Sequence, residues 1–359
     1  MRNRAYMTLL LTLAMTALAL SCTKTDRVYD GSAGEVCFSP VGDVMHRSAD
    51  TKTLDYPDEG VFGVFARHAD CPGGTAWNDQ TAFNSSVPYL ENVAFGKNGE
   101  NWAGCNPSDH AHTPYYWPLS GSLMFAGYSP HKEVSEGTIT EVTFVTHMIE
   151  GYVNPYLMID FTQNETPGQM TDLLWFDVGD VAAGKTVGKT SDPVAFEFRH
   201  ALSKVSFSFV DSNRMYKLKE VSLTGCVNSA VFYSGMTAGW SPKIDVLADY
   251  KLLAEQIQPE NMPLLNGWES SELYVIPQYL DGVFPVVGTG ANDTGVDVKL
   301  AFTLTGNEGY GSENIEILLH DCTKHWIMGY HYHYQVTLEA DPIHFGAPEV
   351  SITPQMIAL

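Results

Sequence analysis

The chain has few basic residues. Its 359 residues include 20 lysines and arginines against 42 aspartates and glutamates, which gives a formal net charge of −22. Proteins that bind nucleic acid need a basic footprint, so this class is excluded. The excess of acid instead suits a protein whose surface is held off a membrane of like charge.

Motifs of the common enzyme classes are also missing. The sequence contains no nucleophile elbow, phosphate-binding loop, zinc-protease helix or EF-hand loop. Gly288-Thr289-Gly290 precedes a predicted strand, which is typical of a turn and not of a phosphate cradle. Asp109 lies beside His110 without a nucleophile partner, and His200 falls on an apolar face as a core histidine would. We therefore predict that the protein is not an enzyme and carries no cofactor.

Two histidine pairs are the best candidates for a metal site. His110 and His112, and likewise His331 and His333, are two residues apart, so each pair would share one strand face. A structural metal site usually has four ligands, and no further ligand is fixed nearby in sequence. The second pair also has a simpler explanation, because the opposite face of its strand is apolar, with Tyr330, Tyr332, Tyr334, Val336 and Leu338. We predict no metal at either pair.

Cysteines are few and irregularly spaced. Beyond Cys22 the chain has five, Cys37, Cys71, Cys105, Cys226 and Cys322. An odd number at wide spacing gives neither a disulfide framework nor a CxxC zinc pattern. Two interpretations of Cys71 and Cys105 stay open. They could form a disulfide across loops rich in glycine and proline, or they could be small buried thiols.

One long apolar run is present, at residues 7–20, and it is too short to span a bilayer. It follows Arg2 and Arg4 and ends just before Ser21-Cys22, which is the arrangement of a lipoprotein signal peptide. We predict cleavage between Ser21 and Cys22 and lipid attachment at Cys22, which would anchor the chain to a membrane. Removal of residues 1–21 takes away two arginines and leaves 18 basic and 42 acidic residues, a net charge of −24. An ordinary signal followed by an incidental cysteine is the alternative.

In most of the chain, apolar residues occur in short runs that alternate with polar ones at a period of two, and helical periodicity is absent. Val194, Phe196, Phe198 and His200 would share one face of a strand, as would the alternating apolar residues of 205–209 and 296–304. One short helix is predicted at residues 247–258. Further strands are predicted at residues 61–66, 115–118, 123–130, 138–148, 156–161, 171–176, 218–223, 229–233, 273–278, 315–319 and 330–338.

A small, polar, glycine-containing stretch at residues 181–193 is the best candidate for a domain boundary. The predicted organisation is a signal peptide at 1–21, a linker at 22–34, an N-terminal domain at 35–190 and a C-terminal domain at 191–359. Many short strands with regular turn signals predict an all-β fold of two antiparallel β-sandwich domains in tandem.

Six segments in order give the chain a resemblance to the fimbrillin family of Bacteroidetes surface lipoproteins, the Mfa-like and FimA-like type V pilins. They are EVCFSPVGDVMHR at 35–47, YWP at 116–118 with LMFAGYSP at 123–130, TDLL at 171–174, FRHALSKV at 198–205, LYVIPQ at 273–278, and the strand at 329–338 with IHF at 343–345. The resemblance implies transthyretin-like sandwiches, a lipid anchor at Cys22 in the outer membrane, and a place in a fimbrium beside other fimbrial subunits.

The resemblance also implies an assembly mechanism. An arginine-specific protease would cut after Arg47, and the first strand would leave its groove for a donor strand of the next subunit. The removable strand would span about residues 35–45 at the edge of the N-terminal sandwich, with Glu35, Val36, Cys37, Phe38, Val41, Val44 and Met45. The donor would come from the C-terminal segment, with Ile352, Met356, Ile357 and Leu359. Pro354 interrupts that segment and removes one ladder hydrogen bond, which favours an acceptor or tip subunit.

We therefore expect a structural, tip or accessory subunit of fimbriae that mediates cell adhesion through a receptor that the sequence does not identify. The alternative is an outer-membrane lipoprotein that does not polymerise and binds glycans on exposed aromatic residues, for which the candidates are Trp77, Trp102 and Tyr115-Tyr116-Trp117. Core packing is the competing role for these rings. A β-sandwich hydrolase would require paired carboxylates in a cleft.

Overall fold

The computed structural model describes residues 34–40, 56–77, 79, 86–149, 152–177, 179–180, 183–211, 216–234, 238–285, 291–293, 295–306, 312–338, 343–345 and 349–352. These residues form strands and no α-helix, so the prediction of an all-β chain is confirmed. Four single turns of 3₁₀-helix connect strands, η1 (Lys132–Val134), η2 (Pro167–Gln169), η3 (Pro259–Asn261) and η4 (Leu319–Asp321).

A nine-stranded sheet occupies one end of the molecule. Its strands lie in the order β12 (Val194–Phe196), β1 (Cys37–Pro40), β4 (Asn101–Gly104), β3 (Val87–Asn98), β2 (Val61–Ala69), β5 (Ser122–Ser129), β8 (Leu174–Asp177) and β13 (Arg199–His200), with β11 (Val187–Gly188) also pairing with β5. The two ends of this order, β12 and β13, are only two residues apart in the chain. The sheet therefore curls back on itself like an open barrel.

A four-stranded sheet covers one face of this first sheet, in the order β17 (Gly239–Pro242), β16 (Ser229–Tyr233), β7 (Tyr152–Thr162) and β6 (Ile139–Ile149). Two small hairpins are formed by β9 (Gly179–Asp180) with β10 (Ala183–Gly184) and by β20 (Val283–Pro285) with β21 (Ala291–Asp293).

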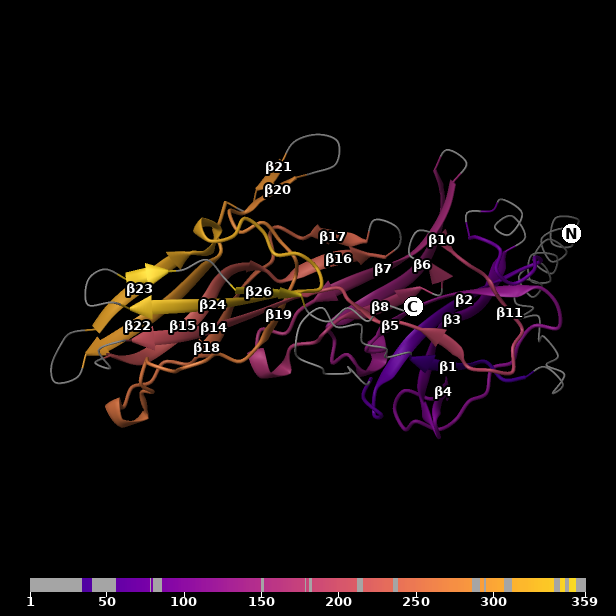
Figure 1. Cartoon of the computed structure of the whole chain (residues 1–359), viewed down its shortest axis with the longest axis horizontal. Helices are drawn as coiled ribbons and strands as arrows, with labels where there is room; N and C mark the ends of the chain where they lie inside the picture. The colour runs from indigo at the N-terminus through magenta and orange to yellow at the C-terminus, as the bar shows by residue number, and fades with distance from the viewer. Residues whose placement is uncertain are drawn as a thin grey trace, which may run out of the picture.

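Two further sheets pack together at the other end of the elongated molecule (Figure 1). One has the order β19 (Leu273–Val275), β14 (Ser203–Asp211), β24 (Tyr330–Leu338) and β25 (Ile343–Phe345), and β26 (Glu349–Ile352) also pairs with β24. The other has the order β18 (Leu247–Leu253), β15 (Tyr216–Val227), β22 (Lys299–Gly306) and β23 (Ser312–Leu318).

Three main apolar clusters lie between these layers. One fills the inside of the curled sheet, a second lies between its outer face and the β6–β7–β16–β17 sheet, and a third lies between the two C-terminal sheets. β5 contributes side chains to the first two clusters, because Phe125 faces the inner cluster while Met124 and Ala126 face the second. All eight of its residues are buried, which explains why it reads as a continuous apolar run.

Among the described strands, pairing is antiparallel almost throughout, as predicted, with two parallel exceptions. β1 runs parallel to β12, and β14 runs parallel to β24 over eight residue pairs. β1 is therefore not an edge strand, contrary to expectation, because β12 extends the sheet beyond it. Local sequence carries no signal for a partner more than 150 residues away.

Three predictions about individual elements were wrong. Residues 247–253 form the strand β18 and not a helix, since Ala248 and Tyr250 are buried while Asp249 and Lys251 are exposed, a period of two. Residues 115–118 form no strand and contribute one isolated bridge, between Tyr116 and Glu35. The alternation from 194 to 200 is broken into β12 and β13, with residues 197 and 198 outside both strands.

The sheets extend across the predicted boundary at residue 190. β12 and β13 join the strands of the first sheet, and β16 pairs with β7. The C-terminal pair of sheets begins with β14, a few residues after β13. The division into domains at residue 190 stays a prediction. Strands before residue 190 pair with strands after it.

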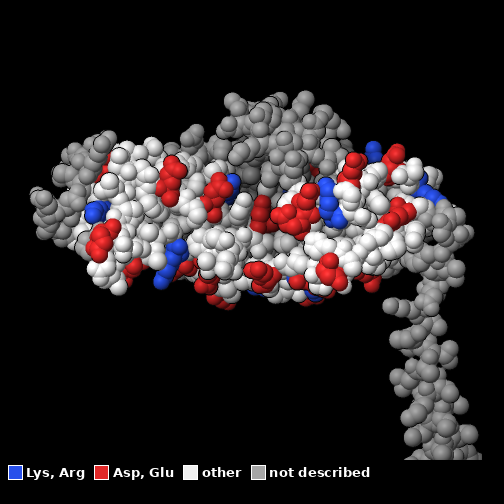
Figure 2. Space-filling model, turned by 90° about the horizontal axis from the view of Figure 1, so that it is seen from below, with Lys and Arg blue, Asp and Glu red and all other residues white. Residues whose placement is uncertain are grey.

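Cys37, Cys71, Cys105, Cys226 and Cys322 are all free. The disulfide considered for Cys71 and Cys105 is therefore wrong, and both thiols are buried. Acidic side chains are spread along the whole described face in Figure 2, with basic ones scattered between them, as the net charge requires.

Candidate functional site

β1 is the structural bridge between two strands that meet only through it. Its Phe38 is opposite Trp102 of β4 on one side and Val194 of β12 on the other. In the described sheet, β4 and β12 have no direct pairing with each other. Departure of β1 would therefore leave backbone groups unpaired on both neighbours, which is the condition for accepting another strand.

Phe38 fills the centre of an aromatic cluster inside the curled sheet. The side chains of Phe38 and Val36 are fully buried, whereas Glu35 and Cys37 are half-buried. The Phe38 centroid lies 4.9 to 6.2 Å from five other rings, those of Phe62, Phe95, Phe125, Phe176 and Phe196. Edge-to-face pairs of this kind contribute about 0.5–1.5 kcal/mol each beyond the area that they bury.

The segment before β1 is held by the Tyr115–Trp117 loop. The backbone N–H of Val36 donates to the carbonyl of Tyr115 at 2.7 Å, and the N–H of Trp117 donates to the carbonyl of Gly34 at 3.0 Å. Oε1 of Glu35 lies 2.6 Å from Nε2 of His112, an ion pair when that histidine is protonated. The tyrosine and tryptophan run that sequence analysis read as a strand thus supports the entry to β1.

The thiol of Cys37 faces away from the aromatic cluster. Burial, with a smaller contribution from the Glu35 carboxylate, raises its pKa above the ordinary value. The thiol therefore stays protonated at neutral pH, which is typical of a structural and unreactive cysteine.

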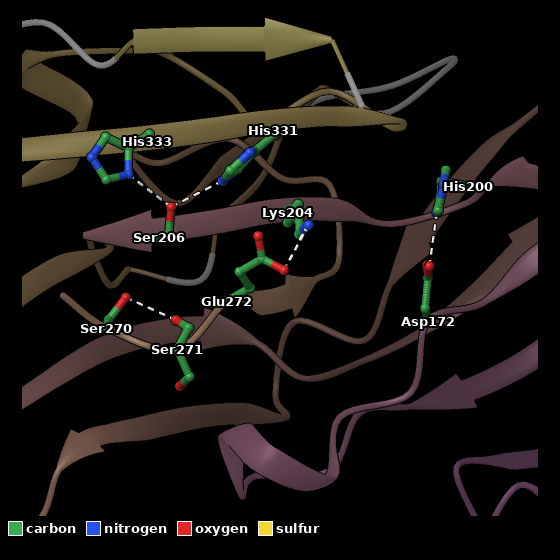
Figure 3. Close-up of polar contacts among 9 residues, drawn as sticks. All are labelled: Asp172, His200, Lys204, Ser206, Ser270, Ser271, Glu272, His331 and His333. Atoms are coloured by element: carbon green, nitrogen blue, oxygen red, sulfur yellow. Dashed lines mark hydrogen bonds and ion pairs between the residues drawn. The ribbon is translucent and has the colours of Figure 1, made fainter. Parts of the chain in front are cut away.

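A cavity of about 480 Å³ opens at the end of the curled sheet toward which β1 points. Tyr56 and Phe198 stack in its wall with centroids 4.8 Å apart, and the Tyr56 hydroxyl lies 2.8 Å from Oγ of Ser129. Asp172 and His200 line its polar side, with His200 Nδ1 2.8 Å from Oδ2 of Asp172 (Figure 3).

His200 carries the charge pattern of a buried ion pair. Burial lowers its pKa, but the nearby Asp172 carboxylate outweighs this, so that the pKa lies above the ordinary value for histidine. His200 is 8% exposed, which agrees with the predicted core position. The sequence does not predict its partner, Asp172, because 28 residues separate the two and the pairing of β8 with β13 brings them together.

His331 and His333 lie on one face of β24, as predicted, and both contact Ser206 of β14 (Figure 3). Ser206 Oγ is 2.9 Å from Nε2 of His331 and from Nδ1 of His333, and Ser208 Oγ is 2.8 Å from Nε2 of His333. Within the described residues, no group of three or more histidines, cysteines and carboxylates is placed to hold a metal.

The aromatic residues considered as a glycan platform are mostly inside the protein. Trp77, Trp102 and Trp117 are 4%, 5% and 2% exposed. Their indoles belong to the apolar clusters, so they offer no open ring face to a sugar.

Several predicted site residues lie outside the described part of the chain. These are Ser21, Cys22, Val41, Val44, Met45, Arg47, Met356, Ile357 and Leu359. Ile352 is the last residue of β26 and is opposite Tyr330 of β24. None of the described segments is an apolar helix of bilayer-spanning length.

Comparison with known proteins gives matches to one family. A family model described as fimbrillin-like matches residues 70–354. No curated protein sequence matches the chain. Among solved structures, a candidate cell adhesion protein from Bacteroides uniformis ATCC 8492 aligns with a TM-score of 0.52 and 17% identity, over 90% of this chain and 100% of that one.

Two further solved structures are similar at lower scores. One is a candidate cell adhesion protein from Bacteroides ovatus ATCC 8483, with a TM-score of 0.49 and 15% identity over 93% of this chain and 100% of that one. The other is the C-terminally truncated tip fimbrial protein Mfa3 from Porphyromonas gingivalis, with a TM-score of 0.36 and 10% identity over 82% of this chain and 96% of that one.

The family-model match confirms the resemblance found in the sequence. The family model covers most of the chain and includes strands that contribute to all three apolar clusters, whereas β1 and β2 lie before the matched residues. The B. uniformis structure shows that the same fold is used elsewhere. The chain belongs to the fimbrillin-like family.

Proposed function

We propose that this protein is a subunit of a surface fimbria and that it takes up a strand of its neighbour in place of β1. The observation that carries the proposal is the position of β1 between β4 and β12, with Phe38 in the middle of five phenylalanine rings. A strand so placed can be replaced only by another strand that supplies the same hydrogen bonds and an apolar side chain.

Proteolysis after Arg47 is the proposed trigger. It would separate β1 from the rest of the chain while leaving Tyr56 and everything after it in one piece. Lipid on Cys22 would hold the precursor at the outer membrane, and one cut would release the anchor together with the strand. The proposed location is therefore the outer membrane first and the fimbrium afterwards.

The C-terminal segment is the proposed donor. Its first part, β26, pairs with four residues of β24 in its own subunit, Tyr330 to His333. Donation of residues 352–359 would have to break or bypass that pairing, and Pro354 withholds one hydrogen bond. Both features support a role as acceptor, tip or accessory subunit more than one as shaft subunit.

The proposal is tested with the chain from residue 22 onward, carrying Cys22→Ser so that no lipid is attached. Limited digestion with a trypsin-like protease is followed by intact mass and size-exclusion chromatography. We expect a cut after Arg47, loss of the β1 segment and growth of larger species. A folded, cut core that stays monomeric at every concentration would rule out donation by this chain's own C-terminal segment, and a core that also fails to bind a peptide copy of residues 34–45 would rule the proposal out.

A disulfide staple provides the matched control. Cys37 is directly opposite Ala103 in an antiparallel pair, where Cα atoms lie about 4.5–5.5 Å apart and a disulfide can form. Ala103→Cys should lock β1 onto β4, so that the oxidised protein is still cut but does not associate. Reduction should restore association in the same sample.

A further inference from the structure

The cavity lined by Tyr56, Phe198, Asp172 and His200 lies on the path of any strand that continues β1. β1 is parallel to β12, with Phe38 opposite Val194 and the position of Pro40 opposite Phe196. Two further residues in the same register bring a strand level with Phe198, which forms part of the cavity wall. Val194 and Phe196 of β12 and Phe198 just after it are all part of the inner cluster.

The cavity and the β1 groove share their wall. Tyr56 stacks on Phe198 and also packs edge-on against Trp102 of β4, with centroids 6.0 Å apart. Trp102 is itself opposite Phe38 of β1. A strand in the groove would therefore pass from the Phe38 site directly to the cavity.

The cavity has the chemistry for one particular kind of side chain. Its apolar wall includes Val61, Val134, Leu174 and Phe198. Its polar side carries Asp172 and His200, which are paired with each other, with Oδ2 of Asp172 2.8 Å from Nδ1 of His200. Oδ1 of Asp172 is inaccessible to an occupant, so the cavity favours a large side chain that packs against its apolar wall.

We propose that the strand which replaces β1 extends beyond it and inserts an aromatic side chain into this cavity, four positions after the residue that takes the place of Phe38. This inference rests on the proposed strand exchange and adds a second anchor to it. The chain's own residue at that position of the sequence is Gly42, which has no side chain to offer. The incoming strand would thus bind more tightly than the strand it displaces.

Three fluorescent peptides test the proposal. The first copies residues 34–45, the second carries Gly42→Phe and the third carries Gly42→Tyr. Each is added to the Cys22→Ser chain cut after Arg47, and dissociation is followed by anisotropy. Full burial of one aromatic side chain predicts that the Gly42→Phe peptide leaves about 10- to 100-fold more slowly than the copy. The Gly42→Tyr peptide, whose ring fills the same space, should leave at about the same slow rate.

Two protein variants locate the effect. Val134→Trp should fill the cavity and remove the advantage of both substituted peptides while leaving binding of the copy unchanged. Val246→Trp is the matched control, since Val246 is about as exposed as Val134 (40% against 38%) and does not line the cavity. Equal dissociation of all three peptides would overturn the cavity anchor while leaving strand exchange standing. Failure of all three to bind would overturn strand exchange itself and this inference with it.

Discussion

Phe38 is the residue on which the stability of the precursor should depend most directly. It is fully buried and surrounded by five rings, so Phe38→Ala leaves a cavity that the neighbouring strands cannot close. We expect the free energy of unfolding of the uncut chain to fall by about 3–5 kcal/mol, measured by urea denaturation. Leu119→Ala, at a residue that is 73% exposed, should change it by no more than about 0.5 kcal/mol. An unchanged value for Phe38→Ala would show that β1 does not support the inner cluster.

The Asp172–His200 pair predicts a specific dependence of stability on pH. The pKa of His200 is raised in the folded protein, so the pair contributes fully below about pH 6.5, the ordinary value, and loses its contribution as pH rises through the raised pKa. Asp172→Asn should therefore lower the free energy of unfolding by about 1–3 kcal/mol at pH 6 and by less at pH 9. Parallel urea titrations at the two pH values measure this. The same loss at both would contradict a charged pair.

For individual residues, the sequence predicts which side chains are buried in the core but not which residues they contact. Alternation correctly placed Phe207 and Phe209 in the core and His331 and His333 on the opposite face of their strand. It could not predict that Ser206 joins the two histidines, because Ser206 and His331 are 125 residues apart and meet only through the parallel pairing of β14 with β24. Long-range partners are set by the topology, which local periodicity does not encode.

Individual strands show a similar limit. β18 was mistaken for a helix because its last two residues and the three that follow it, LLAEQ at 252–256, have high helix propensity. The burial of Ala248 and Tyr250 instead follows the sheet. β3, the twelve-residue neighbour of β2, was not predicted at all. Its sequence, VPYLENVAFGKN, mixes a proline, a glycine and charged residues, and its pairing with β2 is interrupted by register shifts that blur the alternation.

Removal of β26 distinguishes the donation of a strand by this chain from the acceptance of one. A chain ending before Glu349 loses the strand that pairs with Tyr330 to His333 and also the proposed donor residues, but it keeps β1 and its groove. After cutting, it should accept a strand and give none. Added to the cut full-length chain, it should therefore shorten the assemblies in proportion to its share, measured by electron microscopy or light scattering. Assemblies of unchanged length would place the donor elsewhere than in residues 349–359.

The whole molecule is elongated, with its curled sheet at one end and the paired C-terminal sheets at the other (Figure 1). The all-β class was predicted correctly because local sequence is enough to recognise many short alternating runs. The way the layers join was not predicted, since β12 and β13 belong to the first sheet although they follow the glycine-containing stretch at 181–193. β12 also closes one side of the β1 groove, so the joint between the layers is part of the proposed site.

Net charge predicts how copies of this molecule meet. The chain from Ser48 onward, after removal of the five basic and four acidic residues before it, keeps 15 basic and 38 acidic residues, and the acidic side chains are spread over the face in Figure 2. Two such copies repel each other over the Debye length, which falls from about 30 Å at 0.01 M salt to about 8 Å at 0.15 M. Association of the cut chain with itself should therefore speed up with salt, by about tenfold over this range if many charges face each other, in stopped-flow light scattering.

Salt dependence also identifies the kind of neighbour. Dissociation of a strand from the groove breaks hydrogen bonds and apolar contacts around Phe38, which salt screens little, so the off-rate should stay nearly constant while the on-rate rises. The control of low charge is the Gly42→Tyr peptide. Its two acidic residues, Glu35 and Asp43, give it a much smaller charge than a second subunit and hence a weaker salt effect. An on-rate that falls with salt for a natural partner subunit would mean that this acidic protein is met by a basic surface, and the fimbria would then alternate two kinds of subunit.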